Sequence, residues 1–289
     1  MGFLLDELHE EVVKVQKKAG DIADSSPAVN EARDDGWLEV GHKQKVASTR
    51  TTTILESPIT KIFGGKLRSE FRVKGLQPSV TLEPYQPLQL DIQSPHVFTI
   101  VDALKQLTKP EVIHGSFKSP RGTNDTATKT VYIETLPPVL ILHLKRFQYD
   151  NKGGTQKLWK KIGYPLQLDF PKDTLSPNKR AGPQARYKLI GVVYHHGKSA
   201  SGGHYTVDVQ RQDGKNWIRL DDTVIKRVHA NDVKVDLKEV RAANGTDTEE
   251  EGGWENVGSG AADGTTTPNG TQLYSKDSKV AYILFYQRI

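Results

Sequence analysis

The segment from residue 203 to residue 222 constrains the fold most, because its strand pairing follows from the residues alone. Gln212-Asp213-Gly214-Lys215 supplies a tight turn with a glycine where a positive φ is needed. When the residues that flank this turn are paired, Asp208 faces Arg219, and apolar residues face each other on the other side of the hairpin. That apolar face of the first strand comprises Tyr205, Val207 and Val209. A slip of one residue would destroy both agreements, so the sequence predicts one register.

In this register His204 and Asp221 share the polar face and lie diagonally across the two strands, about 7–8 Å apart at Cα. An Asp–His hydrogen bond spans that distance, whereas Asp222 is expected to point to the opposite face. Such a pair is the base and the orienting acid of a nucleophile–histidine–aspartate triad. Gly202 and Gly203 permit close backbone approach beside it. The alternative interpretation is an ordinary surface histidine and aspartate on adjacent strands.

Two other chemistries fit the same region less well. His195 and His196 together with His204 suggest a metal site, but adjacent side chains of a strand point to opposite faces and do not easily bind one ion. Ser199 and Ser201 lie close to the histidine in sequence, but their spacing does not match a nucleophile elbow. We therefore expect no metal and no serine nucleophile here.

Composition excludes several classes of site. The chain has 289 residues, of which 36% are hydrophobic and none is cysteine. Disulfides, cysteine-bound zinc and a thiol nucleophile therefore cannot come from these residues. The length allows one large domain or two modest ones. The mean hydropathy of −0.56 and the short apolar runs predict a polar globular chain, and we expect no association with a membrane.

The net charge of +5 and the isoelectric point near 9.1 are mild. Basic residues are scattered, and short groups such as Lys157, Lys160 and Lys161 are interpreted as solvated surface. A basic face that binds nucleic acid is the alternative. It rests on charge alone, so we expect no nucleic-acid partner.

Hydrophobic periodicity predicts a mixed pattern of helices and strands. Helices are expected at residues 3–20 and 99–107, and strands at 36–40, 52–55, 66–73, 88–92, 139–144, 187–196, 204–211, 217–221 and 280–288. A turn is expected at 58–65, and no regular structure at 21–35, 116–128 and 241–270. Residues 139–144 are apolar at nearly every position, which predicts burial on both faces. The first helix carries an apolar stripe through Leu4, Leu8 and Val12 that needs a packing partner.

Four segments, in this order, resemble the ubiquitin-specific protease family. The segment at 137–147, Pro-Pro-Val-Leu-Ile-Leu-His-Leu-Lys-Arg-Phe, is similar to the strand that opens the C-terminal half of these proteases. Gly202-Gly203-His204-Tyr205-Thr206 resembles the family's His box, and Trp217-Ile218-Arg219-Leu220-Asp221-Asp222 its Asp box. Residues 281–286 resemble the closing strand. The similarity covers nearly the whole chain apart from the insertion after Arg241.

The resemblance implies an α+β fold, a papain-like cysteine protease shaped as a hand. A truncated helical thumb would occupy residues 1–35, β-rich fingers 36–135, and a palm sheet 136–289. The implied activity is that of a thiol hydrolase that cleaves the isopeptide bond after the C-terminal glycine of ubiquitin. Ubiquitin and ubiquitinated proteins are the implied partners, and the cytoplasm or the nucleus is the implied location.

The resemblance also assigns roles to residues. His204 matches the general base and Asp221 the orienting acid, with Asp222 as an assistant. The implied substrate-binding residues are Gly202, Gly203, Tyr205 and Trp217. Loops at 148–161 and 197–203 match those that close over the tail of ubiquitin.

Two departures from the family pattern matter. The family's Cys box lies N-terminal to everything present here, so we expect a truncated chain that is inactive alone. A non-catalytic ubiquitin-binding module is the alternative. Many members also hold the fingertips with Cys-x-x-Cys zinc ligands, but residues 73–76 and 118–122 carry no thiol. We therefore expect neither zinc nor another cofactor.

Overall fold

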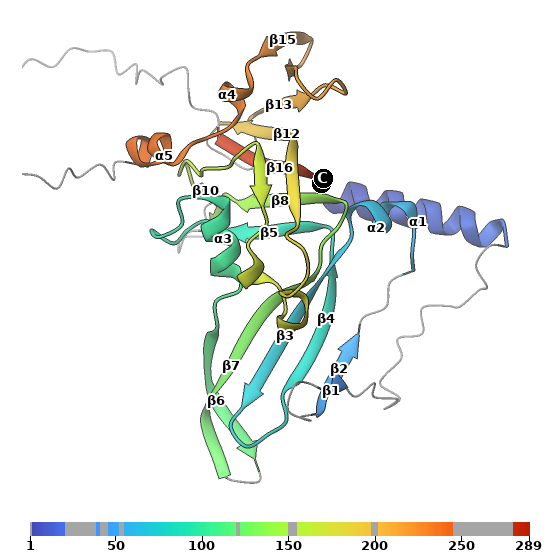
Figure 1. The fold of residues 1–289 in the computed structure, drawn as a ribbon, viewed down its shortest axis with the longest axis vertical. Coiled ribbons are helices and arrows are strands. Elements are labelled where there is room, and N and C mark those ends of the chain that lie inside the picture. The colour runs from blue at the N-terminus through green and yellow to red at the C-terminus, as the bar shows by residue number, and fades with distance from the viewer. Residues whose placement is uncertain are drawn as a thin grey trace, which may run out of the picture.

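Two large β-sheets organise the described part of the protein, and a third, two-stranded sheet is formed by β9 (Phe147–Tyr149) and β10 (Thr155–Lys157) (Figure 1). The computed structural model describes residues 2–20, 39–40, 46–51, 55–119, 122–149, 155–197, 202–244 and 280–289. A six-stranded sheet forms a long ribbon that extends away from an eight-stranded sheet, and helix α1 (Gly2–Lys18) projects from the side of the latter. Within the described ranges, no helix is both long and apolar enough to cross a bilayer.

The eight-stranded sheet carries the predicted site. Its strands are β5 (Pro87–Asp91), β8 (Val139–Lys145), β11 (Gln167–Asp169), β12 (Arg186–His196), β13 (His204–Gln210), β14 (Trp217–Asp221), β15 (Val224–Val228) and β16 (Val280–Arg288). The central path runs β15-β14-β13-β12-β16-β8-β5, with β11 beside β12. Strands expected near 88–92, 139–144, 187–196, 204–211, 217–221 and 280–288 are confirmed, whereas β11 and β15 were not predicted.

The six-stranded sheet forms the ribbon. Its strands are β1 (Glu39–Val40), β2 (Val46–Thr51), β3 (Gly65–Val73), β4 (Ser79–Tyr85), β6 (Glu111–Ser119) and β7 (Gly122–Thr135), in the order β1-β2-β4-β3-β7-β6. The expectation of no regular structure at 116–128 is wrong. These polar residues include several β-branched threonines, and β7 satisfies its backbone by pairing with β3 on one side and β6 on the other.

The other differences from the expected elements are local. The described part of the region expected as a strand at 52–55 is Leu55 alone, which lies outside any strand. Residues 21–35 lie outside the described ranges. Residues 87–107 fall within the predicted fingers, yet β5 pairs with β8 of the eight-stranded sheet, and helix α3 (Ile100–Leu107) packs on β5. The boundary at residue 135 therefore does not separate the two sheets.

The turn expected at 58–65 is instead helix α2 (Pro58–Phe63). The Thr60 N–H donates to Oγ of Ser57, and the Ser57 N–H donates to Oγ1 of Thr60, which forms a capping box. Proline at the first helical position has no N–H to leave unpaired. Two short helices follow the hairpin, α4 (Ala230–Val233) and α5 (Leu237–Asn244). The first four residues of the insertion expected at 241–270 are therefore helical, and the rest lies outside the described residues.

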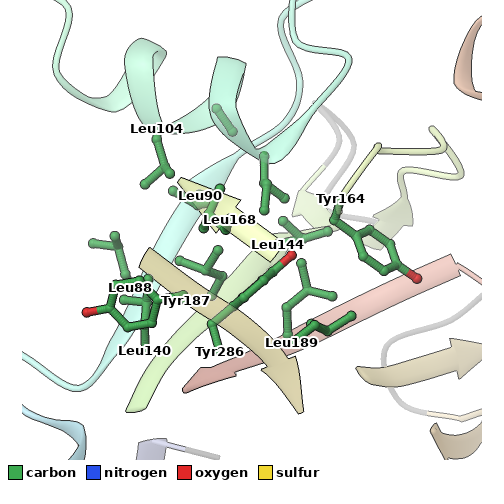
Figure 2. Packing of buried hydrophobic residues seen from close by; sticks show 14 of the residues in the cluster. Leu88, Leu90, Leu104, Leu140, Leu144, Tyr164, Leu168, Tyr187, Leu189 and Tyr286 are labelled. Carbon is green, nitrogen blue, oxygen red and sulfur yellow. The ribbon is translucent and has the colours of Figure 1, made fainter. Parts of the chain in front are cut away.

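The main hydrophobic core lies on one face of the eight-stranded sheet (Figure 2). Leu140, Leu142 and Leu144 of β8 pack there with side chains of β5, β12, β16 and α3, including Tyr187 and Leu104. Ile141 of the same strand faces the other side, in a smaller cluster with Leu5 and Ile283. The predicted burial of this strand on both faces is confirmed.

Helix α1 packs through a different stripe from the expected one. Leu5 and Val13 are buried, whereas Leu4 is 57% and Leu8 38% exposed. His9, four residues after Leu5, contacts Ser57 through its Nδ1 atom at 2.8 Å. The helix therefore lies against the sheet along the row of Leu5, and most of the predicted stripe faces outward.

Candidate active site

The hairpin formed by β13 and β14 has the predicted register. Asp208 pairs with Arg219 and Val207 with Leu220, and the Arg211 N–H donates to the Asn216 carbonyl beside the turn. The pairing of these two strands was therefore correctly derived from turn chemistry and side-chain alternation.

Burial of the two faces is the reverse of what their polarity alone suggests. Thr206 and Asp208, on the polar face, are buried, whereas Tyr205 on the apolar face is 48% exposed. Burial of Asp208 is tolerated because Arg219 donates to both of its carboxylate oxygens, from Nε and from Nη2, at 2.7 Å each. The buried position 208 is therefore occupied by an ion pair with Arg219 and not by an apolar side chain.

His204 and Asp221 meet directly, from the first residue of β13 and the last of β14. The Nε2 atom of His204 lies 2.5 Å from Oδ1 of Asp221, and both side chains are a little more than 40% exposed. An ionised carboxylate only accepts, so Nε2 carries the proton and donates it. The second ring nitrogen, Nδ1, is left as the basic one. The hydrogen bond with Asp221 raises the pKa of His204 above its ordinary value of 6.5, against a smaller desolvation effect.

Asp222 does not point away from the site, as the extended pairing predicted. Its backbone adopts a positive φ of 49°, so the strand alternation ends there. The Oδ2 atom of Asp222 lies 3.8 Å from Nδ1 of His204, on the side of the ring opposite Asp221. The imidazole is therefore flanked by two carboxylates, and potential ligand atoms of the three side chains lie within 4.8 Å of one another. Because Nε2 is already bound to Asp221, this arrangement suits proton transfer better than metal ligation.

The backbone directly before His204 is too crowded for a side chain at Gly203. A Cβ atom on Gly203 would lie 2.4 Å from Nε2 of His195 and 2.4 Å from the carbonyl oxygen of His196. Gly197 has a φ of +109°, and a Cβ there would lie 3.0 Å from Cα of Gly203. The two ends of the connection between β12 and β13 thus pack against each other without side chains between them. Gly202 is open, since a Cβ atom there would meet nothing within 4 Å.

The neighbouring histidines do not gather around His204 as metal ligands. His195 is buried among aromatic rings, with centroid distances of 5.3 Å to Phe147 and 4.8 Å to Tyr205. His196 is the cross-strand partner of His204, with the two ring centroids 5.7 Å apart, and its Nε2 atom lies 2.9 Å from Oγ1 of Thr206. Ser199 and Ser201, the serine candidates, lie outside the described residues.

The four residues expected to bind substrate differ in solvent exposure. Gly202, Gly203 and Tyr205 are exposed beside the histidine, where a ligand can reach them. Trp217 is only 2% exposed and belongs to the hydrophobic core, so we assign it a packing role.

Sequence reasoning missed Lys157 and Arg146. The interpretation of the lysines at 157–161 as solvated surface is wrong for Lys157, which is 8% exposed. Arg146 is also buried, although the sequence marks it only as part of a motif. Nothing in the sequence distinguishes Lys157 from its neighbours, because its burial depends on a contact with a strand some 38 residues away.

The fold and the histidine–aspartate pair together define a class of protein. Residues 1–286 match the family model described as "Ubiquitin carboxyl-terminal hydrolase", and the chain belongs to this family.

Individual relatives agree with this assignment. The chain is 47% identical over 253 residues to the "Probable ubiquitin carboxyl-terminal hydrolase 3" of Schizosaccharomyces pombe, a match that covers 81% of this chain and 49% of that protein. It is 39% identical over 248 residues to "Ubiquitin carboxyl-terminal hydrolase 10" of Rattus norvegicus, covering 79% of this chain and 31% of that protein. The match thus spans 49% and 31% of the length of these two curated relatives.

Solved structures show the same fold. The SAGA Ubp8/Sgf11/Sus1/Sgf73 DUB module bound to ubiquitin aldehyde contains a chain with a TM-score of 0.57 and 25% identity, covering 79% of this chain and 42% of that one. A second Ubp8 module matches over 100% of this chain and 49% of that chain, with a TM-score of 0.62 at 22% identity. The predicted family and fold class are therefore confirmed.

Proposed function

We propose that residues 1–289 form the part of a ubiquitin hydrolase that carries the general base and its orienting acid. The observation that carries the proposal is the contact of His204 Nε2 with Asp221, which leaves Nδ1 as the basic nitrogen of a side chain that is 43% exposed. Membership of the ubiquitin carboxyl-terminal hydrolase family supports the same roles. In this proposal, His204 is the base and Asp221 orients it, while Asp222 stabilises the protonated ring.

The chemistry requires a thiol, and the 289 residues contain no cysteine. We therefore place the nucleophile outside these residues. Nδ1 of His204 accepts the thiol proton, the thiolate attacks the carbonyl carbon, and the imidazolium gives the proton to the leaving amine as the C–N bond breaks. Water then attacks the thioester carbonyl carbon, the C–S bond breaks, and the proton taken from water by Nδ1 returns to the departing sulfur.

The proposed substrate is ubiquitin joined through its C-terminal glycine to an amine of another protein. The names of both curated relatives, and the ubiquitin aldehyde bound to the SAGA module, support ubiquitin as the ligand. The exposed Gly202 and Gly203 offer backbone groups without side chains beside His204, which suits an extended peptide tail lying close to the strand.

A chimera tests this proposal. In the Schizosaccharomyces pombe relative, the matched region is replaced by the corresponding residues of this chain, and hydrolysis of a ubiquitin–fluorophore conjugate is measured. We expect turnover that is sensitive to iodoacetamide and is abolished by His204→Ala. Residues 1–289 alone should give no turnover, because they supply no thiol. A chimera that folds, binds ubiquitin and does not hydrolyse the conjugate would overturn the proposal.

A second function, binding of ubiquitin without hydrolysis, is favoured by the absence of cysteine from these residues. Calorimetry of residues 1–289 with free ubiquitin addresses it. A monodisperse chain that binds ubiquitin, combined with a folded but inactive chimera, supports the binding module. An active chimera supports the hydrolase.

A further inference from the structure

Lys157 is the last residue of a small hairpin next to the site. Strand β9 (Phe147–Tyr149) pairs with β10 (Thr155–Lys157), and Lys157 lies opposite Phe147. The Lys157 side chain turns away from solvent, and its Nζ atom lies 3.9 Å from the centroid of the Trp159 ring. A lysine whose charged end is buried needs specific partners, because desolvation of an ammonium group is costly.

Those partners are two backbone carbonyls of the strand that leads to the site. Nζ donates to the carbonyl oxygen of His195 at 2.8 Å and to that of Gly197 at 2.9 Å. Throughout the described part of the chain, Lys157 forms no ion pair with a carboxylate. Burial, with a smaller contribution from the charge of Arg146, lowers the pKa of Lys157 to about 8. The charge is therefore held by backbone dipoles and by the face of Trp159.

A second buried cation fixes the segment from which Lys157 extends. Nη1 of Arg146 donates to the carbonyl oxygens of Leu158 at 2.9 Å and Lys160 at 2.8 Å, and Nε donates to that of Ala281 at 2.5 Å. The Leu158 N–H donates back to the Arg146 carbonyl at 2.7 Å. Because these bonds tie the segment to β16 in the middle of the sheet, Lys157 reaches the end of β12 from a rigid base.

The two carbonyls that bind Lys157 lie at the end of β12, and this part of β12 pairs with the start of β13, where His204 lies. In the ladder between β12 and β13, His196 pairs with His204 and His195 with Tyr205. Gly197 packs against Gly203, and the ring of His195 fills the space where a side chain on Gly203 would lie. A displacement of the end of β12 is therefore transmitted to His204 through direct contacts.

We propose that Lys157 is a positioning residue for His204, which it acts on by holding the His195 and Gly197 carbonyls. This proposal rests on the proposed function, since it concerns the same general base. Loss of the ammonium group frees the end of β12, moves Gly203, and weakens the alignment of Nε2 with Asp221. Without these hydrogen bonds, the position of β12 relative to the hairpin β9–β10 is no longer fixed at this end.

The absence of cysteine makes a clean test available. Lys157→Cys introduces the single thiol of the 289-residue chain, and alkylation with 2-bromoethylamine converts it into a lysine analogue. Alkylation with 2-bromoethanol gives a side chain of the same length that ends in a neutral hydroxyl. The two proteins differ only in the group that faces the carbonyls of His195 and Gly197. The pKa of His204 and the amide signal of Gly203 are then measured by NMR.

We expect the neutral side chain to lower the pKa of His204 toward the ordinary histidine value and to shift the Gly203 amide signal. The ammonium side chain should restore both to those of the unmodified protein. The sign is diagnostic, because the loss of a distant positive charge would by itself raise the pKa of a histidine. Equal pKa values of His204 in the two alkylated proteins, or a higher value in the neutral one, would overturn the proposal.

Lys160 provides the matched control. Its Nζ atom also donates to a carbonyl, that of Ser94 at 2.5 Å, and burial also lowers its pKa. The same pair of alkylations at Lys160→Cys should leave His204 unchanged, and an equal effect at both positions would contradict a specific role of Lys157. Lys157→Gln, which is neutral but keeps N–H donors, provides the comparison if the hydroxyethyl protein does not fold. The readout needs no hydrolysis, so an inactive chimera contradicts the proposed function without deciding this inference.

Discussion

Asp221 binds His204 at Nε2, at a distance of 2.5 Å, and so leaves Nδ1 as the nitrogen that can take a proton. In triads of the serine-protease type the two ring nitrogens have the reverse roles, since there the acid binds Nδ1. The choice follows from the position of His204 at the start of β13, where Asp221 approaches from the end of β14. Asp222 lies on the Nδ1 side and can stabilise the imidazolium.

Asp221→Asn should lower the pKa of His204, because the hydrogen bond from Nε2 to the carboxylate is the largest cause that raises it. In the unmodified protein this contact favours the protonated ring, so its contribution to stability is full below the ordinary pKa of 6.5 and is lost as pH rises through the raised value. NMR titration of His204 in residues 1–289 measures the shift. In the chimera, kcat should fall by about 10⁴-fold, as for a triad that loses its orienting acid.

Asp222→Asn is the control for this change. Its carboxylate is 79% exposed and lies 3.8 Å from Nδ1, so its removal should lower the pKa of His204 less than Asp221→Asn does. A larger shift from Asp222→Asn would contradict the assignment of Asp221 as the orienting acid.

Gly203→Ala should reduce activity strongly, because its methyl group would lie 2.4 Å from both the His195 ring and the His196 carbonyl. We expect a loss of stability of about 1–3 kcal/mol, as for other overpacked sites, and a displaced His204. Gly202→Ala, whose methyl group meets nothing within 4 Å, should change stability by less than about 0.5 kcal/mol. Urea unfolding and kcat of the chimera measure both, and equal effects of the two substitutions would contradict the steric argument.

Arg219→Leu should destabilise the protein by about 3–5 kcal/mol, because it leaves Asp208 buried without its bidentate partner. Lys226→Leu replaces a cation that is exposed on the next strand, opposite Arg219, and should have little effect. Replacing Asp208 and Arg219 together by leucine should cost less than the two single losses added, because no unpaired charge is then left. Unfolding by urea, followed by circular dichroism, tests all three; additive losses would show that the pair is not coupled.

Leu5→Ala should cost about 2–3 kcal/mol, since its side chain packs against Ile141 and Ile283. Leu4→Ala, one residue earlier on the exposed side of α1, should change the free energy of unfolding by less than about 0.5 kcal/mol. Thermal unfolding of the two variants compares them. The opposite order would show that the helix packs through its predicted stripe instead.

Local rules succeeded where neighbouring residues decide the structure. The turn at 212–215 and the pairing of Asp208 with Arg219 set the register of β13 and β14, and that register places His204 near Asp221. The same rules failed at Asp222, where a positive φ ends the alternation, and at residues 116–128, where pairing on both sides makes a strand of a polar segment. Both predictions failed because the conformation of these residues depends on neighbouring parts of the fold, and not only on the residues of one strand.

Residue types and contacts across a short turn were enough to predict the absence of a thiol, the pairing of the hairpin, and the histidine and aspartate that we propose as base and orienting acid. The burial of one face of the hairpin, the contact of Asp221 with Nε2 of His204, and the hydrogen bond of Lys157 with the strand before His204 became evident only in the folded chain. These features depend on what packs against each element from distant parts of the chain. A buried ion pair or a buried lysine is stable only when such partners are in place, and the partners are set by the fold.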